Sequence, residues 1–162
     1  MKTASIITIG DELLYGAVVN TNAAYIGQCL SNLGIEPLWS ITVGDSREQI
    51  HQALEIASQQ ADVVLITGGL GPTHDDVTKT IIAEATGLEL VFHQEILDQV
   101  EVMFAQRGVS MPASNRIQAL IPEGADILKN SIGTAPGFSI KHDQASIFVM
   151  PGVPREMKKM MG

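Results

Sequence analysis

The sequence of 162 residues predicts an α/β fold, a single domain built around a mostly parallel β-sheet. Three stretches have the apolar character of strands, residues 3–9, 35–43 and 63–66, and two stretches of helical spacing separate them, residues 23–33 and 47–59. Because right-handed crossover helices lay successive strands parallel, this order predicts a parallel sheet. A chain of this length is long enough to bury one sizeable core.

The first strand, residues 3–9, leads directly into Gly10-Asp11-Glu12, so a glycine and two carboxylates follow the end of a strand. These carboxylates are either functional groups or ordinary turn residues. The next helix, residues 23–33, follows Asn20-Thr21-Asn22, where an Asn or Thr side chain is expected to cap the helix. Gly34 then ends that helix.

The second strand, residues 35–43, contains Pro37, which lacks a backbone donor and therefore favours a strand start or a sheet edge. Gly44-Asp45-Ser46 comes next, and a glutamine three residues after the serine predicts a capping box for the helix over residues 47–59. Asp45 is thus a third carboxylate at a strand end. Taken alone, it is explained by ordinary turn chemistry.

The stretch from Ala61 to Thr78 carries the strongest functional signal. An unbroken apolar run from Val63 to Ile66 is typical of a parallel strand covered on both faces. A loop with three glycines follows, and then Asp75 and Asp76 precede a helix. Open α/β sheets bind ligands at this edge, and glycine N–H groups beside a helix start favour anions. Adjacent carboxylates suit a phosphate bridged by a metal ion.

Structural explanations for the same residues stay open. Acidic residues at a helix start complement the helix dipole, and a glycine-proline turn after a strand is common. The loop matches neither the dinucleotide fingerprint nor the P-loop, and the chain has no zinc-protease, paired-cysteine or nucleophile-elbow pattern. His74 is either a ligand or a bystander. The convergence of Gly10-Asp11-Glu12, Asp45 and Gly68 to Asp76 on one sheet edge is a stronger argument than any one motif.

The second half of the chain predicts further elements, although its loops are less informative. Small residues and hydroxyls in residues 130–137 indicate either a second anion-contacting loop or a surface loop. The sequence stops inside an apparent helix, so residues 1–162 are expected to form one domain of a longer chain. The predicted elements are helices over residues 77–86, 96–107 and 155–161, an extended stretch over 88–92, a helical turn over 115–119, and a β-hairpin of strands 138–141 and 146–150 around a turn at 142–144.

Composition excludes several classes of function. Ten basic against 18 acidic residues give a net charge of −8, which argues against a general nucleic-acid surface but not against a small anionic ligand. No apolar run reaches the roughly 20 residues that a membrane span needs, and the N-terminus does not read as a signal peptide. Cys29 is the single cysteine, so no disulfide framework exists and a cytoplasmic location is expected.

The motifs taken together resemble a known family. The stretch Thr67 to Thr78 resembles the signature of the molybdenum-cofactor-biosynthesis (MoaB/MogA-like) domain and, more closely, that of the amino-terminal domain of the competence/damage-inducible protein CinA family. Further matches occur in the family's order along almost the whole chain: Gly10 to Leu14, Asn20-Thr21-Asn22, Val43-Gly44-Asp45, Asn115-Arg116 with Gln118-Ala119, Gly133 to Phe138, and Pro151 to Met157.

The resemblance implies a three-layer αβα fold and a metal-dependent hydrolysis of ADP-ribose to AMP and ribose 5-phosphate. The wider family implies an alternative, molybdopterin binding with transfer of AMP, and a non-catalytic nucleotide-binding module is a third hypothesis. A divalent ion (Mg²⁺, Mn²⁺ or Co²⁺) is implied as cofactor and a nucleotide as partner. A homo-oligomer is expected by analogy and from the methionine-rich end, Met157 to Met161.

The resemblance and the strand-end argument together name a set of candidate site residues. Asp76, Asp45 and Asp75 are expected to be catalytic, with Asp45 and Asp76 also binding the metal ion. The expected substrate-binding residues are Gly10, Asp11, Glu12, Thr67, Gly68, Gly69, Gly71, Asn115, Gly133, Thr134, Pro151 and Gly152.

Overall fold

The computed structural model describes residues 1–162 as one α/β unit, with a central sheet and helices on both of its faces. The elements in chain order are β1 (Thr3–Ile9), α1 (Asp11–Leu14), α2 (Thr21–Asn32), β2 (Glu36–Val43), α3 (Arg47–Gln60), β3 (Val63–Thr67), α4 (Thr78–Thr86), β4 (Leu90–Phe92), α5 (Gln94–Gln106), the 3-10 helix η1 (Ala113–Ala119), β5 (Leu120–Pro122), β6 (Asp126–Leu128), β7 (Gly137–His142), β8 (Ala145–Met150) and α6 (Pro154–Met161).

The main sheet has six strands in the order β2-β1-β3-β8-β7-β6. The first four of these are parallel, and β7 and β6 are each antiparallel to their neighbour. Thr8 of β1 lies opposite Thr42 of β2 and Thr67 of β3, and Thr67 in turn lies opposite Met150 of β8. The carboxyl ends of four strands therefore meet at one edge of the sheet.

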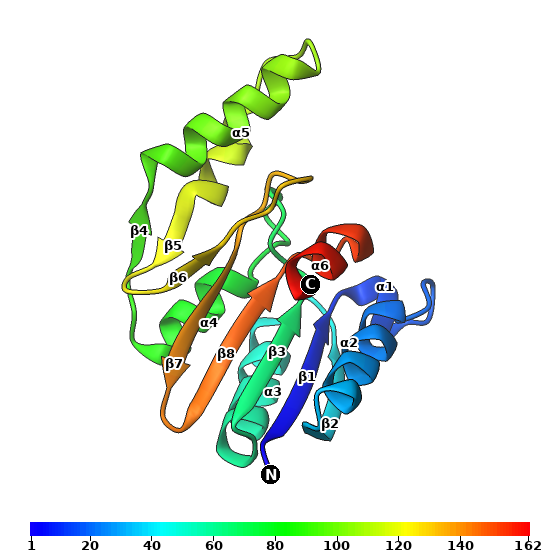
Figure 1. Ribbon diagram of the computed structural model, residues 1–162. Coiled ribbons are helices and arrows are strands. Elements are labelled where there is room, and N and C mark those ends of the chain that lie inside the picture. Colours follow the sequence, from blue (N-terminus) through cyan, green and yellow to red (C-terminus); the bar gives the residue numbers. More distant parts are fainter.

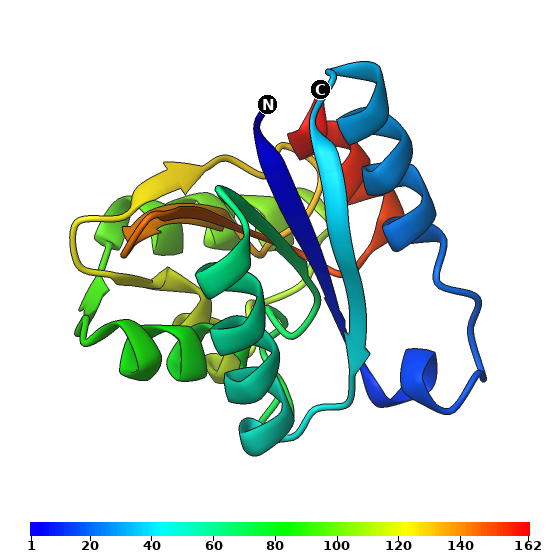
Figure 2. The same cartoon turned by 90° about the horizontal axis from the view of Figure 1, so that it is seen from below.

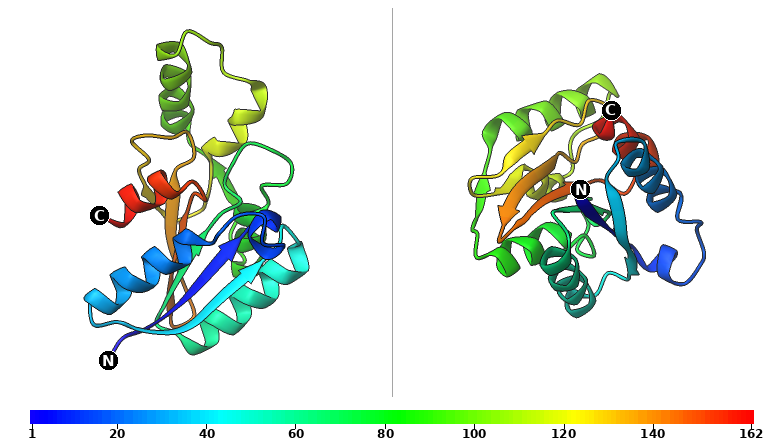
Figure 3. Two further views of the ribbon diagram at one scale, coloured as in Figure 1. Left: turned by 90° about the vertical axis from the view of Figure 1, so that its right-hand side faces the viewer. Right: turned by 60° about the horizontal axis from the view of Figure 1, so that its bottom comes forward.

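Helices cover the sheet in two layers, as the resemblance implied. Figures 1 and 2 show α2 and α6 on one face, and α3 with α4 on the other. The helix α5 extends away from the sheet, where it packs on η1, and the two-stranded sheet β4–β5 lies beside them (Figure 3). No helix of the fold has both the length and the apolar character that a membrane crossing requires.

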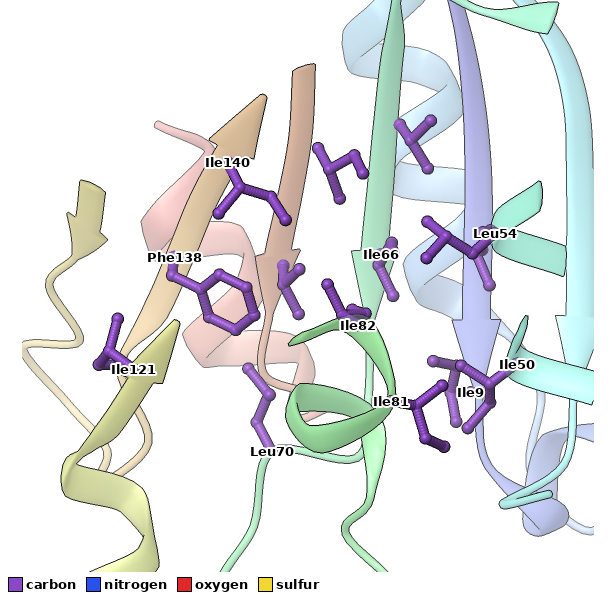
Figure 4. Close-up of a cluster of buried hydrophobic side chains, with 14 of the residues drawn as sticks. Ile9, Ile50, Leu54, Ile66, Leu70, Ile81, Ile82, Ile121, Phe138 and Ile140 are labelled. Carbon is purple, nitrogen blue, oxygen red and sulfur yellow. The ribbon is translucent and has the colours of Figure 1, made fainter. Parts of the chain in front are cut away.

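Two separate hydrophobic clusters hold the layers together, because successive strand residues point to opposite faces. On β3, Val64 and Ile66 belong to the cluster under α3 and α4, whereas Leu65 belongs to the cluster under α2 and α6. Figure 4 shows the larger cluster, in which Phe138 of β7 and Ile82 of α4 are fully buried. Each such side chain contributes roughly 1.5–3 kcal/mol when it leaves water.

The main architecture confirms the sequence predictions, including the hairpin, whose turn contains Asp143 at a φ of 52°. Pro37 lies on the edge strand β2, beside an irregularity in its pairing with β1. Three short elements were not predicted. Asp11 begins a short helix, α1, β5 pairs with β4, and β6 adds a strand to the free edge of β7.

The predicted capping box at the start of α3 forms only on one side. The Ser46 hydroxyl accepts from the Gln49 N–H at 3.5 Å, but the Gln49 side chain accepts from the Gly44 N–H at 3.0 Å instead of turning back to Ser46. Gln49 therefore stabilises the turn that carries Asp45. The tertiary contact with Gly44 takes precedence over the local motif.

Candidate functional site

A cleft of about 500 Å³ opens at the edge where the strands β1, β2, β3 and β8 end. Its walls come from segments that are far apart in the sequence: the turn after β1, the start of α2, the turn after β2, the loop after β3 and the turn after β8. It is lined by Ile9, Gly10, Glu12, Leu13, Val18, Val19, Asn20, Thr21, Asn22, Asp45, Thr67, Gly68, Gly69, Leu70, Gly71, Thr73, Asp75, Asp76, Gly152, Val153 and Pro154.

The loop after β3 needs its first two glycines both for their backbone conformation and for lack of space. Gly68 and Gly69 have φ angles of 111° and 69°, a region that residues with a Cβ rarely adopt. An added Cβ on Gly68 would also overlap the Ile9 carbonyl, and one on Gly69 would overlap the Thr78 side chain. Leu70 is only 6% exposed and belongs to the larger hydrophobic cluster, so its side chain anchors the loop in the core (Figure 4).

Asp76 is fixed in its position by the loop that carries it. Its Oδ2 atom accepts hydrogen bonds from the Thr73 N–H at 3.0 Å and from the Thr73 hydroxyl at 2.7 Å. Gly71 lies against the same carboxylate, since an added Cβ there would be 2.5 Å from Oδ2. Neighbouring Asp75 is exposed and pairs with exposed His74 at 3.3 Å, and His74 does not line the cleft.

Asp45 and Asp11 hold each other across the ends of β1 and β2. The Asp45 N–H donates to Asp11 Oδ1 at 2.9 Å, and the Asp11 N–H donates to Asp45 Oδ2 at 3.3 Å. Partial burial raises the pKa of the Asp45 carboxyl, and the charges of Asp11, Glu12 and Asp76 raise it further, while the bond from the Asp11 N–H opposes this. Three neighbouring carboxylates thus act on Asp45 at this edge.

The carboxylates do not form a metal site that the protein completes by itself. No group of three or more His, Cys, Asp and Glu side chains is arranged to hold an ion. Mg²⁺, however, keeps several waters and commonly binds through one or two carboxylates together with substrate phosphates. Asp45 and Asp76, which both line the cleft, therefore fit an ion that a phosphate ligand helps to bind, and they do not fit a permanently bound structural ion.

Most of the residues that the sequence named lie at this cleft. Ten of the predicted residues line it: Gly10, Glu12, Asp45, Thr67, Gly68, Gly69, Gly71, Asp75, Asp76 and Gly152. Two more lie directly behind it, because Asp11 is hydrogen-bonded to Asp45 and the Pro151 carbonyl accepts from the Thr67 hydroxyl at 2.8 Å. The structure does not bring Asn115, Gly133 and Thr134 into the cleft.

Asn115 lies on η1, where it is buried and donates to the Gln118 side chain at 2.9 Å. The same segment binds α4, since Lys79 Nζ donates to the Ile117 carbonyl at 2.7 Å. Burial lowers the pKa of Lys79 to about 8. The segment around Asn115 thus contacts the helix that follows the glycine loop and does not contact the cleft.

Gly133 and Thr134 belong to a loop that is closed by its own side chains. Asn130 accepts from the N–H groups of Ile132 and Gly133 and donates to the Ala135 carbonyl and to Glu156 of α6. An added Cβ on Gly133 would overlap the Glu156 carboxylate. The glycine is therefore explained by packing against α6.

The sequence argument did not identify the opposite wall of the cleft as a set of site residues. Asn20, Thr21 and Asn22 were predicted as a helix start, and they also line the cleft. Val19 and Val153 do so as well, with exposed fractions of 80% and 51%. The available signal was the polar sequence Asn20-Thr21-Asn22 between a strand and a helix. The sequence contained no signal for the two valines.

Comparison with known proteins agrees with this fold. Residues 5–162 match the family model described as "Probable molybdopterin binding domain". The chain therefore belongs to that family, the MoaB/MogA-like molybdopterin-binding domains, and it is most similar there to the CinA-like proteins.

A putative competence-damage inducible protein of Caldicellulosiruptor saccharolyticus is 48% identical over 157 residues, which are 97% of this chain and 38% of that protein. A CinA-like protein of Chloroherpeton thalassium is 48% identical over 98% of this chain and 39% of its own length. The chain thus spans about two-fifths of the length of these relatives.

Solved structures show the same fold. The crystal structure of CinA from Thermoplasma acidophilum, described as of unknown function, superimposes with a TM-score of 0.90 at 34% identity, over 99% of this chain and 94% of that chain. MoaB from Pyrococcus furiosus, described as a tungsten cofactor synthesizing protein, has a TM-score of 0.65 at 21% identity, over 99% and 88%. The second likeness concerns the fold alone.

Proposed function

We propose that this domain hydrolyses the pyrophosphate bond of ADP-ribose with the help of a divalent metal ion, giving AMP and ribose 5-phosphate. One observation carries the proposal: the glycine loop after β3 and the carboxylates of Glu12, Asp45, Asp75 and Asp76 line the same cleft. Backbone N–H groups suit phosphate oxygens, whereas carboxylates repel them unless a cation lies between.

Different residues of the cleft have different roles in the proposed hydrolysis. Asp45 and Asp76 would hold Mg²⁺, Mn²⁺ or Co²⁺ together with the pyrophosphate. When bound, such an ion polarises phosphate oxygens and lowers the pKa of a coordinated water. The N–H groups of Gly69, Leu70 and Gly71 would stabilise the charge that grows on the non-bridging oxygens, since the Gly68 N–H already donates to the Met150 carbonyl at 3.1 Å. The oxygen of a water bonds to one phosphorus as the bridging P–O bond breaks and the displaced phosphate leaves with the electron pair. We assign to Asp75 the role of accepting the proton that this water loses.

The rigidity of the loop supports this assignment. Asp76 is oriented by two hydrogen bonds from Thr73, and Leu70 is buried in the core beneath the loop. Such a loop needs little rearrangement when charge develops, which is the condition for effective electrostatic stabilisation. The single unpaired Cys29 agrees with a reaction in the reducing cytoplasm.

The family description, a probable molybdopterin binding domain, favours one other function. As the alternative we propose molybdopterin binding with transfer of AMP from ATP, which the resemblance to the wider family implies. Both reactions act on a pyrophosphate joined to adenosine and need the same carboxylates. They differ in the acceptor, which is water in the first and a pterin in the second.

Chromatography of ADP-ribose incubated with the protein and Mg²⁺, Mn²⁺ or Co²⁺ tests the proposal. Equal amounts of AMP and ribose 5-phosphate are expected, and none in the presence of a chelator. Unchanged ADP-ribose with every ion would contradict hydrolysis. Incubation with ATP, Mg²⁺ and molybdopterin tests the second function through the release of pyrophosphate. Binding of ADP-ribose or AMP without turnover would identify a nucleotide-binding module.

A further inference from the structure

Asn22 joins two turns of the cleft that are distant in the sequence. It is the second residue of α2 and is 6% exposed. Its side-chain amide donates one hydrogen bond to the Gly152 carbonyl at 2.9 Å and another to the Thr67 hydroxyl at 3.1 Å. The Thr67 hydroxyl in turn donates a hydrogen bond to the Pro151 carbonyl at 2.8 Å. Both amide hydrogens of Asn22 are thus used.

This network controls carbonyl oxygens beside an anion site. Pro151 and Gly152 form the turn after β8, and Gly152 lines the cleft next to the glycine loop. An added Cβ on Gly152 would be 3.2 Å from the Gly68 Cα, so the two turns are packed closely. A carbonyl oxygen directed at a phosphate would repel it, whereas one that accepts from a side chain is held in place.

The hydrogen bonds determine which way the Asn22 side-chain amide is oriented, that is, where its nitrogen and oxygen lie. The Gly152 oxygen can only accept, so the Asn22 atom that meets it must be the nitrogen. The Asn22 oxygen is consequently left without a partner, although it is buried. A buried acceptor without a donor costs about 1–3 kcal/mol, so the arrangement is not the most stable one for this position. Its retention is explained if the two donated bonds serve the cleft.

We infer that Asn22 is a positioning residue for anion binding: it holds the carbonyls of Pro151 and Gly152 away from the bound pyrophosphate. The inference rests on the proposed function only in that the ligand is a nucleotide pyrophosphate. Glycine at position 152 leaves the peptide free to rotate when the bond from Asn22 is lost. The carbonyl then turns toward the ligand and weakens its binding, with less effect on the chemical step.

The test measures ligand binding by the folded protein, using calorimetry with ADP-ribose and Mg²⁺. Asn22→Ala is expected to weaken binding about tenfold and to raise KM more than it lowers kcat. Asn22→Asp is expected to bind still more weakly at pH 8, because a carboxylate donates no hydrogen bond. Relative to wild type at the same pH, its binding should recover as the pH falls toward 5 and below, because burial at this position raises the pKa of a carboxyl and the protonated acid donates one hydrogen bond.

Thr3→Val is the matched control. Thr3 makes two side-chain hydrogen bonds with Asp62 at the opposite edge of the sheet, at 3.1 and 3.2 Å. This substitution should lower the melting temperature and leave ADP-ribose binding unchanged. A crystal structure of Asn22→Ala should show the Gly152 carbonyl turned into the cleft.

Several results would overturn the inference: an unmoved Gly152 carbonyl, wild-type affinity in Asn22→Ala, a uniform loss in Asn22→Asp at every pH, or no binding of ADP-ribose by wild type. Failure of the proposed function is distinguishable from these. If wild type binds ADP-ribose and Asn22→Ala binds it more weakly, but neither forms AMP, hydrolysis is excluded while the role of Asn22 stands.

Discussion

The loop after β3 and the loop before β7 share one local feature but have different surroundings. In each loop a glycine lies against a carboxylate, Gly71 against Asp76 and Gly133 against Glu156. Both carboxylates accept hydrogen bonds from nearby donors. Only the first loop opens onto the cleft, where Asp45 supplies a second carboxylate.

This difference shows that a glycine beside a carboxylate does not define a site. The glycine is explained in both loops by a lack of space for a Cβ. What distinguishes the first loop is its place at the carboxyl edge of a parallel sheet, where the ends of β1, β2 and β8 add their own groups. The second loop instead packs against α6 through Asn130 and Glu156.

The largest expected effect is that of Asp76→Asn. The amide oxygen still accepts from the Thr73 donors, so the loop should keep its shape, but the charge is lost. Turnover of ADP-ribose should fall about 10²-fold or more, on the order of 3 kcal/mol of barrier. The melting temperature in chelator should stay unchanged.

Glu156→Gln is the counterpart in the second loop, because it likewise removes a charge and keeps an acceptor for Asn130. Its turnover should match wild type. Full activity in Asp76→Asn with the metal and substrate that wild type uses would remove the distinction between the loops.

A second comparison uses Gly71→Ala and Gly133→Ala. Neither glycine has a positive φ, so the backbone tolerates alanine, and in each case the new Cβ displaces the end of a flexible carboxylate side chain. Both changes should cost about 1–3 kcal/mol or less in stability. Because Gly71→Ala displaces Asp76, it alone should lower turnover, by about tenfold. Equal losses of turnover in the two variants would show that the loops are functionally alike.

Asp45 connects charge at the cleft with stability. Its pKa is raised in the folded state, so the folded protein retains a proton longer than the unfolded chain, and stability falls as the pH rises from the ordinary carboxyl pKa through the raised one. Without metal, Asp45→Asn should therefore melt a few degrees above wild type at pH 7. The difference should disappear on acidification below the ordinary value.

Millimolar Mg²⁺ or Mn²⁺ with AMP should raise the melting temperature of wild type more than that of Asp45→Asn. Scanning calorimetry at several pH values measures both effects. A wild type that is the more stable protein at pH 7 without metal would contradict the cost of ionising Asp45, which comes first from its burial and then from the neighbouring carboxylates.

The smallest effect is expected at Asp143, in the hairpin turn between β7 and β8. Asp143 has a φ of 52°, which asparagine tolerates well. Asp143→Asn should change neither the melting temperature nor turnover, as measured beside Asp76→Asn. A loss of activity would show that turnover responds to the overall charge of the protein and not to the cleft.

The sequence predicted much of the fold because its signals are local. Apolar periodicity marked the strands and helices, and the alternation of the two types predicted parallel pairing at β1, β2 and β3. The same alternation placed Gly10, Asp45 and Gly68 at one edge before any contact was known. The short strands β5 and β6 escaped prediction, since three residues carry too little periodic signal.

The sequence by itself determined the parallel direction of the first three strands, the glycine loop and the carboxylates at the strand ends, because backbone conformation and strand polarity depend on neighbouring residues. Tertiary structure alone decided that Asn22 would meet Gly152, that Gln49 would bind Gly44, and that Asn115 and Gly133 would lie away from the cleft. These contacts join segments through the packing of whole layers. Their partners are therefore fixed by three-dimensional distance, which spacing along the chain does not encode.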